Sequence, residues 1–94
     1  MTNIIEVNEE VLQVVYDSRK SFYGKAHVLT QGDVKQLRSY DTIVAAITNM
    51  GATVYGTYSP TTLRHIKEFL YQNGFEVGTK KEIEEMYIDK IVFK

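Results

Sequence analysis

The two histidines, His27 and His65, are the best candidates for metal chemistry, because the chain contains no cysteine. They lie 38 residues apart and belong to neither an HxxxH nor an HExxH pattern, so a metal site would need both side chains and a distant carboxylate. A small metal-stabilised domain using His27 and His65 is therefore one alternative. The opposing interpretation places His27 on the surface of a sheet and His65 on the surface of a helix.

Thr61 and His65 form the only spacing that suggests a nucleophile beside a base, because residues four apart are neighbours on a helix. The helical pattern places this pair on the solvent side, roughly opposite Leu63 and without a third orienting group. The six glycines are scattered and form no phosphate-binding loop. We therefore expect a protein that is not an enzyme and has no cofactor.

Aromatic and cationic residues offer the stronger signal. Tyr23, Lys25 and His27 alternate along one predicted strand, and a predicted helix carries further such residues on its solvent side. This combination suits base stacking with phosphate pairing, and it also suits an acidic protein surface. The simpler interpretation is an ordinary solvated face. The candidate partner-binding residues are Tyr23, Lys25, His27, Arg38, Arg64, Lys67 and Tyr71.

Charge is segregated along the chain. Residues 18–40 carry five Lys or Arg against one Asp, for +4, whereas the whole chain has 11 Lys and Arg against 12 Asp and Glu. The total of −1 excludes a strongly basic protein but allows a local basic patch. Seven tyrosines and four phenylalanines are more rings than a small domain readily buries, which favours a protein interface.

The first half of the sequence predicts strands. The run Val11–Tyr16 is β-branched and aromatic, with a short helix after Asn8 as the alternative. Further extended patterns, in which Ile43, Ala45 and Ile47 would share one face, are separated by turns at 31–33 and 49–51. These patterns cover residues 22–29, 34–40, 42–48 and 52–58, with a last short strand at 91–93.

The second half predicts two helices. Ser59 and Pro60 form a helix start, and Asn73-Gly74 forms its end. Thr79 and Glu82 have the spacing of a capping box. The predicted fold is α+β, a small antiparallel sheet of three to five strands packed on one face by two C-terminal helices. With 94 residues, we expect a single domain spanning 1–94.

The start of the chain, MTNIIEVNEE, has no basic region followed by an apolar core, and no long apolar run occurs later. We therefore expect no secretory signal and no membrane partner. Without cysteine, the composition fits a reducing compartment such as the cytoplasm.

Three blocks, SFYGKA at residues 21–26, RSYDTIVA at 38–45 and YSPTTLRHIKEFL at 58–70, resemble a family of small, functionally uncharacterised proteins from phages and mobile elements of Gram-positive bacteria. The resemblance covers about residues 20–75. It implies a phage-type accessory factor, and inhibitors of bacterial defence nucleases, the anti-CRISPR proteins, are one such class. No catalytic residue is carried over from the family.

Together these observations predict a non-enzymatic module that binds and masks a host macromolecule, such as a CRISPR-Cas effector or another nucleic-acid machine. Direct binding of single-stranded nucleic acid is the alternative, and it predicts a steep dependence on salt. An exposed sheet edge could also pair two copies of the chain in a homodimer.

Overall fold

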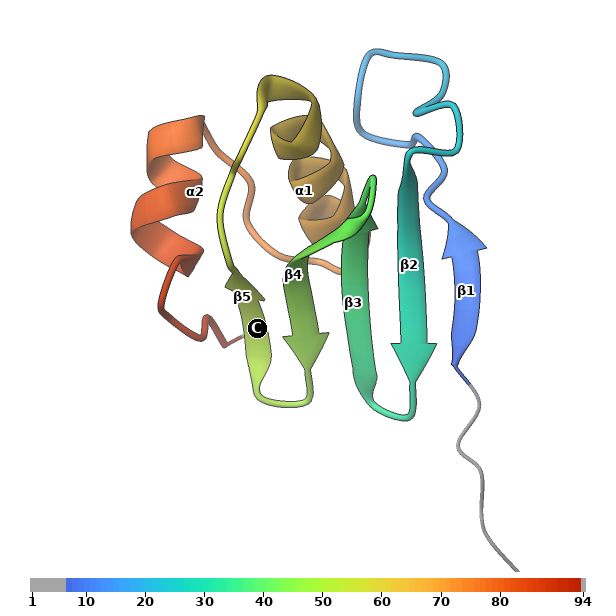
Figure 1. The fold of residues 1–94 in the computed structure, drawn as a ribbon. Coiled ribbons are helices and arrows are strands. Elements are labelled where there is room, and N and C mark those ends of the chain that lie inside the picture. The colour runs from blue at the N-terminus through green and yellow to red at the C-terminus, as the bar shows by residue number, and fades with distance from the viewer. Residues whose placement is uncertain (1–6, 94) are drawn as a thin grey trace, which may run out of the picture.

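A computed structural model of the chain describes residues 7–93. Five consecutive strands form one antiparallel sheet in the order β1-β2-β3-β4-β5, and two helices follow. The helices lie against the sheet on one side, which confirms the predicted α+β fold (Figure 1). The elements are β1 (Asn8–Val11), β2 (Ala26–Gln31), β3 (Val34–Ser39), β4 (Thr42–Thr48), β5 (Gly51–Val54), α1 (Pro60–Gln72) and α2 (Lys80–Tyr87).

The helix boundaries follow the predicted caps. Ser59 is the N-cap of α1, where its side chain accepts the N–H of Thr62, and Asn73 is the C-cap. Thr79 and Glu82 form a complete capping box at the start of α2. These local signals need only a few neighbouring residues, so the sequence alone identifies them.

The pairing of β3 with β4 corrects one predicted alternation. A bulge shifts the register between Leu37 and Arg38, so that Leu37 pairs with Ala45 while Arg38 pairs with Ile43. Ala45 joins the core facing the helices, whereas Ile43 pairs on the opposite face. The prediction that Ile43 and Ala45 share a face was therefore wrong.

The predicted strand at Val11–Tyr16, and its helical alternative, were also wrong. β1 ends at Val11, and the chain from 12 to 25 runs as a loop to β2. β2 starts only at Ala26, because Tyr23 and Gly24 both take positive φ, as in a type I′ turn, with a 2.9 Å hydrogen bond from Lys25 N–H to the Phe22 carbonyl. Tyr23 and Lys25 therefore do not alternate with His27 along one strand.

The two strands predicted after β4, at residues 52–58 and 91–93, are shorter in the structure than the sequence predicts. β5 stops at Val54, and residues 55–58 lead directly to α1. Near the C-terminus, Val92 forms a single antiparallel bridge with Ala52, and Ile88 bridges Val54 in parallel. This segment covers the β5 edge of the sheet, so among the described strands β1 is the one whose outer edge has no partner.

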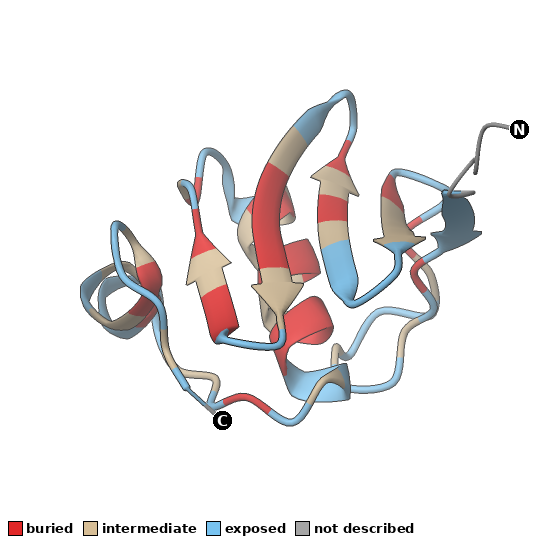
Figure 2. Ribbon diagram, turned by 90° about the horizontal axis from the view of Figure 1, so that it is seen from below, coloured by how far each residue is buried: buried red, intermediate tan, exposed pale blue. Residues whose placement is uncertain are grey.

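The core lies between the sheet and the helices. Figure 2 shows the buried segments concentrated in the central strands and α1, with the hairpin tips and β1 exposed. Leu37, Ala45, Ile66 and Phe69 are fully buried in this layer. No helix in the described part of the chain is long and apolar enough to cross a membrane.

Candidate functional site

A buried carboxylate fixes the long loop between β1 and β2. Glu68 of α1 has no exposed surface. Its oxygens accept the backbone N–H groups of Tyr16 (2.9 and 3.0 Å) and Asp17 (2.9 Å) and the side-chain amide of Gln72 (2.7 Å). Several donors converge on one carboxylate, which compensates for its removal from water. Glu68 thus attaches the loop to the helix.

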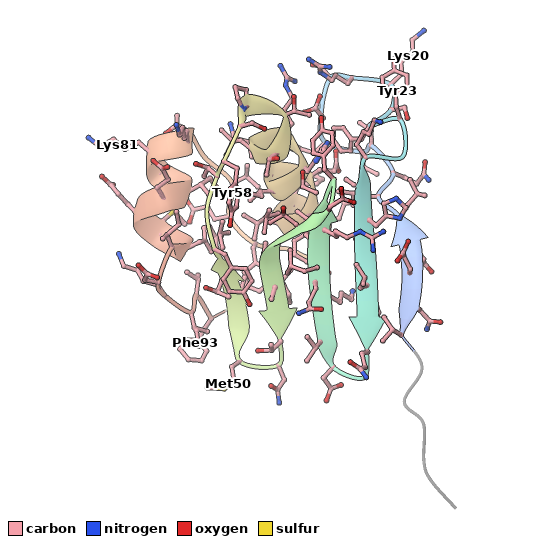
Figure 3. The ribbon with its side chains drawn as sticks, in the orientation of Figure 1. Lys20, Tyr23, Met50, Tyr58, Lys81 and Phe93 are labelled. Atoms are coloured by element: carbon pink, nitrogen blue, oxygen red, sulfur yellow. The ribbon has the colours of Figure 1, made fainter. Side chains whose placement is uncertain are left out.

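Two further contacts complete this attachment. Arg64 forms a salt bridge to Asp17 (3.2 Å), whose side chain is itself almost buried. The ring centroids of Tyr16 and Tyr71 lie 4.8 Å apart. Together these contacts hold the basic segment around Arg19 and Lys20 beside the first turns of α1. Figure 3 shows Lys20 and Tyr23 at the same end of the molecule, far from Met50 and Phe93.

A small pocket lies where this loop meets the β3–β4 hairpin and α1. Its volume is about 190 Å³, below the roughly 300–1,000 Å³ of sites for drug-sized ligands, so it has room for one chemical group of a larger partner. We call it the tyrosine pocket. It is lined by Arg19, Ser21, Phe22, Tyr23, Lys25, Tyr40, Thr61, Arg64 and His65.

Two tyrosines of this pocket have strained backbones. Tyr23 has φ 52° and Tyr40 has φ 56°, a left-handed region that bulky residues seldom adopt and that costs about 1–2 kcal/mol for each residue. Both side chains are exposed, Tyr23 by 77% and Tyr40 by 48%, so core packing does not explain the choice of tyrosine. Strain of this kind concentrates at functional sites.

The pocket is electropositive. Among the described residues, the side chains of Arg19 and Lys25 form no ion pair, while Arg64 is partly neutralised by Asp17. Burial lowers the pKa of His65, and the nearby Asp17 carboxylate partly offsets that effect. His65 is therefore neutral at pH 7, and the positive charge comes from the arginines and lysine.

His65 is the main departure from the predicted placement. The sequence predicts it on the solvent side of the helix, yet it is fully buried, with Nδ1 2.8 Å from the hydroxyl of Ser39 and the ring packed edge-on against Phe22. This Ser–His pair is closed to substrate, since Ser39 is only 2% exposed and its hydroxyl also bonds Thr62. The two residues of the predicted Thr61–His65 pair both line the tyrosine pocket, but Thr61 is partly exposed whereas His65 is fully buried.

The structure brings together some of the predicted binding residues and separates others. Tyr23, Lys25 and Arg64 line the tyrosine pocket. Arg64 also lines a neighbouring hollow of about 590 Å³ with Lys67, and Tyr71 lies beyond it against Tyr16. These five residues therefore follow one end of the molecule and the outer side of α1.

His27 and Arg38 lie outside the tyrosine pocket. They are cross-strand partners on the sheet face opposite the helices, and Glu9 of β1 bonds both, with its Oε2 3.1 Å from His27 Nδ1 and 2.9 Å from Arg38 Nη2. Both side chains are thus occupied by a partner within the sheet. His27 Nε2 also lies 2.9 Å from the carbonyl oxygen of Gly24, next to Tyr23, but neither His27 nor Arg38 lines the tyrosine pocket. The sequence does not reveal their pairing with Glu9.

The histidines also do not meet at a metal. His27 lies on the sheet face away from the helices, whereas His65 is buried between α1 and the sheet. Within residues 7–93, no three His, Asp or Glu side chains are grouped so that they could hold a metal ion. The geometry therefore gives the metal alternative no support.

Sequence reasoning missed several residues of the site, of which Arg19, Tyr40 and Glu68 matter most. Arg19 and Tyr40 line the pocket, and Glu68 positions the loop. Arg19 had a usable signal, because it belongs to the +4 segment. Tyr40 and Glu68 had none, since a left-handed backbone at tyrosine and a buried carboxylate both depend on contacts distant in sequence.

Comparison with known proteins places the chain in a family without assigning it an activity. Searches of curated proteins and of solved structures return no significant match. One family model matches residues 11–85, which include the loop, all the residues of the tyrosine pocket and most of α2. The chain therefore belongs to DUF8033, a family of unknown function.

Proposed function

We propose that this protein is a non-enzymatic binding module that masks an acidic surface of a host macromolecule. The observation that carries the proposal is the cationic end, defined as Arg19, Lys20, Lys25, Arg64 and Lys67. Two acids at this end are already used internally, Asp17 by Arg64 and Glu68 by backbone N–H groups, and Glu82 lies close enough to Lys67 for their charges to interact. Net positive charge at this end therefore remains for a partner, although the whole chain carries −1.

The surrounding tyrosines support the same proposal. Tyr23, Tyr40 and Tyr71 are exposed around the cationic end, and exposed tyrosines bury large areas at low entropic cost when a partner binds. The buried Ser39–His65 pair offers no accessible nucleophile, which favours binding over catalysis. The resemblance to phage proteins directs the search for a partner to host proteins such as CRISPR-Cas effectors.

A charge-reversal experiment tests the proposal. The double variant Arg19→Glu, Lys25→Glu changes two free cations, and it leaves Arg64 in place because that residue anchors the loop through Asp17. The matched control, Lys81→Glu with Lys90→Glu, makes the same change of charge on α2 and the segment that follows it. We expect capture of a host protein from nuclease-treated lysate by the native chain and the control, and its loss in the test variant.

Equal capture by both variants would contradict the proposed surface.

Binding of single-stranded nucleic acid is the second candidate function. The pocket places Tyr23 and Tyr40 beside free cations, and this arrangement can stack bases and pair with phosphates. It predicts that nuclease treatment abolishes recovery and that affinity for an oligonucleotide falls linearly with the logarithm of salt concentration.

A further inference from the structure

A chain of hydroxyl groups sets the proton position on His65. The Ser59 hydroxyl donates to Thr62 Oγ1 (3.2 Å), Thr62 Oγ1 lies 2.9 Å from Ser39 Oγ, and Ser39 Oγ lies 2.8 Å from His65 Nδ1. Each hydroxyl has one hydrogen to donate. All three hydroxyl hydrogens find acceptors if Thr62 donates to Ser39 and Ser39 donates to Nδ1, whereas the reverse direction leaves the Thr62 hydrogen without an acceptor in this network. The network therefore assigns the imidazole proton to Nε2.

This Nε2–H group has no hydrogen-bond acceptor among the described residues, although it is fully buried. A buried donor without an acceptor is unfavourable, because it has lost its hydrogen bond to water and gained none in the protein, so such groups usually have a functional explanation. His65 lines the tyrosine pocket, with Phe22 and Tyr40 packed on its ring at centroid distances of 4.6 and 6.0 Å. Its unused donor is directed away from Ser39, on the side of the ring opposite Nδ1.

The other pocket groups define the chemistry of a ligand. Arg19, Lys25 and Arg64 supply positive charge and N–H donors, and Ser21 and Thr61 supply hydroxyls. None of the described residues that line this pocket is a carboxylate, so a cation would find no charged ligand among them. An apolar ligand would leave the His65 donor unsatisfied. An anion with several acceptor oxygens is the class that satisfies the donors together.

We propose that the tyrosine pocket binds a phosphate group, with His65 Nε2–H as a neutral donor and Lys25, Arg19 and Arg64 as the charged partners. A phosphate group fits because its oxygens accept several hydrogen bonds at once. Because His65 is fully buried, phosphate contact with Nε2 requires the exposed ring of Tyr40, whose centroid lies 6.0 Å from that of His65, to move aside. The inference goes beyond the proposed function and does not depend on it, because a free phosphate compound can occupy the pocket without a macromolecular partner.

Nuclear magnetic resonance of the isotopically labelled full chain tests this site directly. The probes are inorganic phosphate, O-phosphoserine and adenosine 5′-monophosphate, with sodium acetate at matched ionic strength as the control anion. We expect saturable shifts of the His65 ring nitrogens and of the Tyr23, Lys25 and Tyr40 amides with the phosphate compounds. The tightest of the three distinguishes a nucleotide source from a phosphorylated protein.

Variants make the assignment specific. Lys25 is exposed, so Lys25→Gln leaves the fold intact and should weaken phosphate binding about tenfold, the loss expected for one charge-assisted hydrogen bond. Lys81→Gln on α2 is the matched control and should bind like the native chain. Because His65 is buried, His65→Asn is used only if its spectrum shows a folded chain, and it should then lose the shifts at Tyr40.

Several results would overturn the inference. These are the absence of saturable shifts, equal shifts with acetate, and undiminished binding by Lys25→Gln. Failure of host-protein capture would count against the proposed function and leave the phosphate site standing, because the titration contains only this chain and a small anion. Phosphate binding by a variant that no longer captures its partner would show that the two properties are separate.

Discussion

The carboxylate of Glu68 accepts the backbone N–H of Tyr16, 52 residues earlier in the chain, at 2.9 Å through Oε1 and 3.0 Å through Oε2. Glu68 is fully buried and also accepts from Asp17 and Gln72. One side chain therefore connects the loop that carries the free cations to the helix that carries Arg64. The geometry of the cationic end depends on this contact.

Replacing Glu68 by alanine should destabilise the fold by about 2–4 kcal/mol, because the partly buried N–H groups of Tyr16 and Asp17 would lose their acceptor. Urea unfolding followed by circular dichroism measures the change. Glu85→Ala, on the exposed side of α2, is the control and should fall within about 0.5 kcal/mol of the native chain. Similar losses in both variants would show that Glu68 is not the anchor of the loop.

Stability should decline as the pH falls below the ordinary histidine value of 6.5. Burial lowers the pKa of His65 in the folded chain, so the unfolded chain binds the proton more readily and acid favours unfolding. The midpoint of urea unfolding, measured between pH 7.5 and 5, should therefore decrease. A folded His65→Asn variant should lose this part of the decline, whereas His27→Gln should retain it. An unchanged decline in His65→Asn would assign it to other groups.

Relieving the strain at Tyr23 should stabilise the fold while removing a binding group. Asparagine tolerates positive φ, and Asn-Gly is the favoured pair for a type I′ turn. Tyr23→Asn should therefore raise the free energy of unfolding by up to about 1 kcal/mol and weaken partner binding. Tyr55→Asn is the matched control, because Tyr55 is also exposed but does not have positive φ. A loss of stability in Tyr23→Asn would mean that the ring packs more than its exposure indicates.

Gly51 should be intolerant of any side chain. Its φ is +136°, and an added Cβ would lie 2.1 Å from the carbonyl oxygen of Val92. Gly51→Ala should break the two 2.9 Å hydrogen bonds between Ala52 and Val92, with a loss of about 1–3 kcal/mol. Faster amide hydrogen exchange at Val92 would report the local opening.

Gly32→Ala separates this clash from backbone strain alone. Gly32 has φ +58° but no atom within 4 Å of an added Cβ, so its substitution should cost only about 1 kcal/mol and leave exchange at Val92 unchanged. Equal exchange rates at Val92 in the two variants would show that the C-terminal segment does not depend on the close approach to Gly51.

Several features of this protein were determined by the sequence alone. Ser59, Pro60, Thr79 and Glu82 act within a single helical turn, so their caps appear where the local pattern predicts them. The hydrophobic pattern likewise predicted a two-layer α+β fold, because alternating strands followed by amphipathic helices have few ways to bury their apolar faces.

Tertiary structure decided the site. His65 and Glu68 are polar residues that helical periodicity assigns to solvent, yet their partners, Ser39 and Tyr16, come from 26 and 52 residues away. The bulge beside Arg38 and its ion pair with Glu9 are equally non-local. Burial of a polar group is stable only when distant donors and acceptors converge on it, and a one-dimensional pattern contains no record of that convergence.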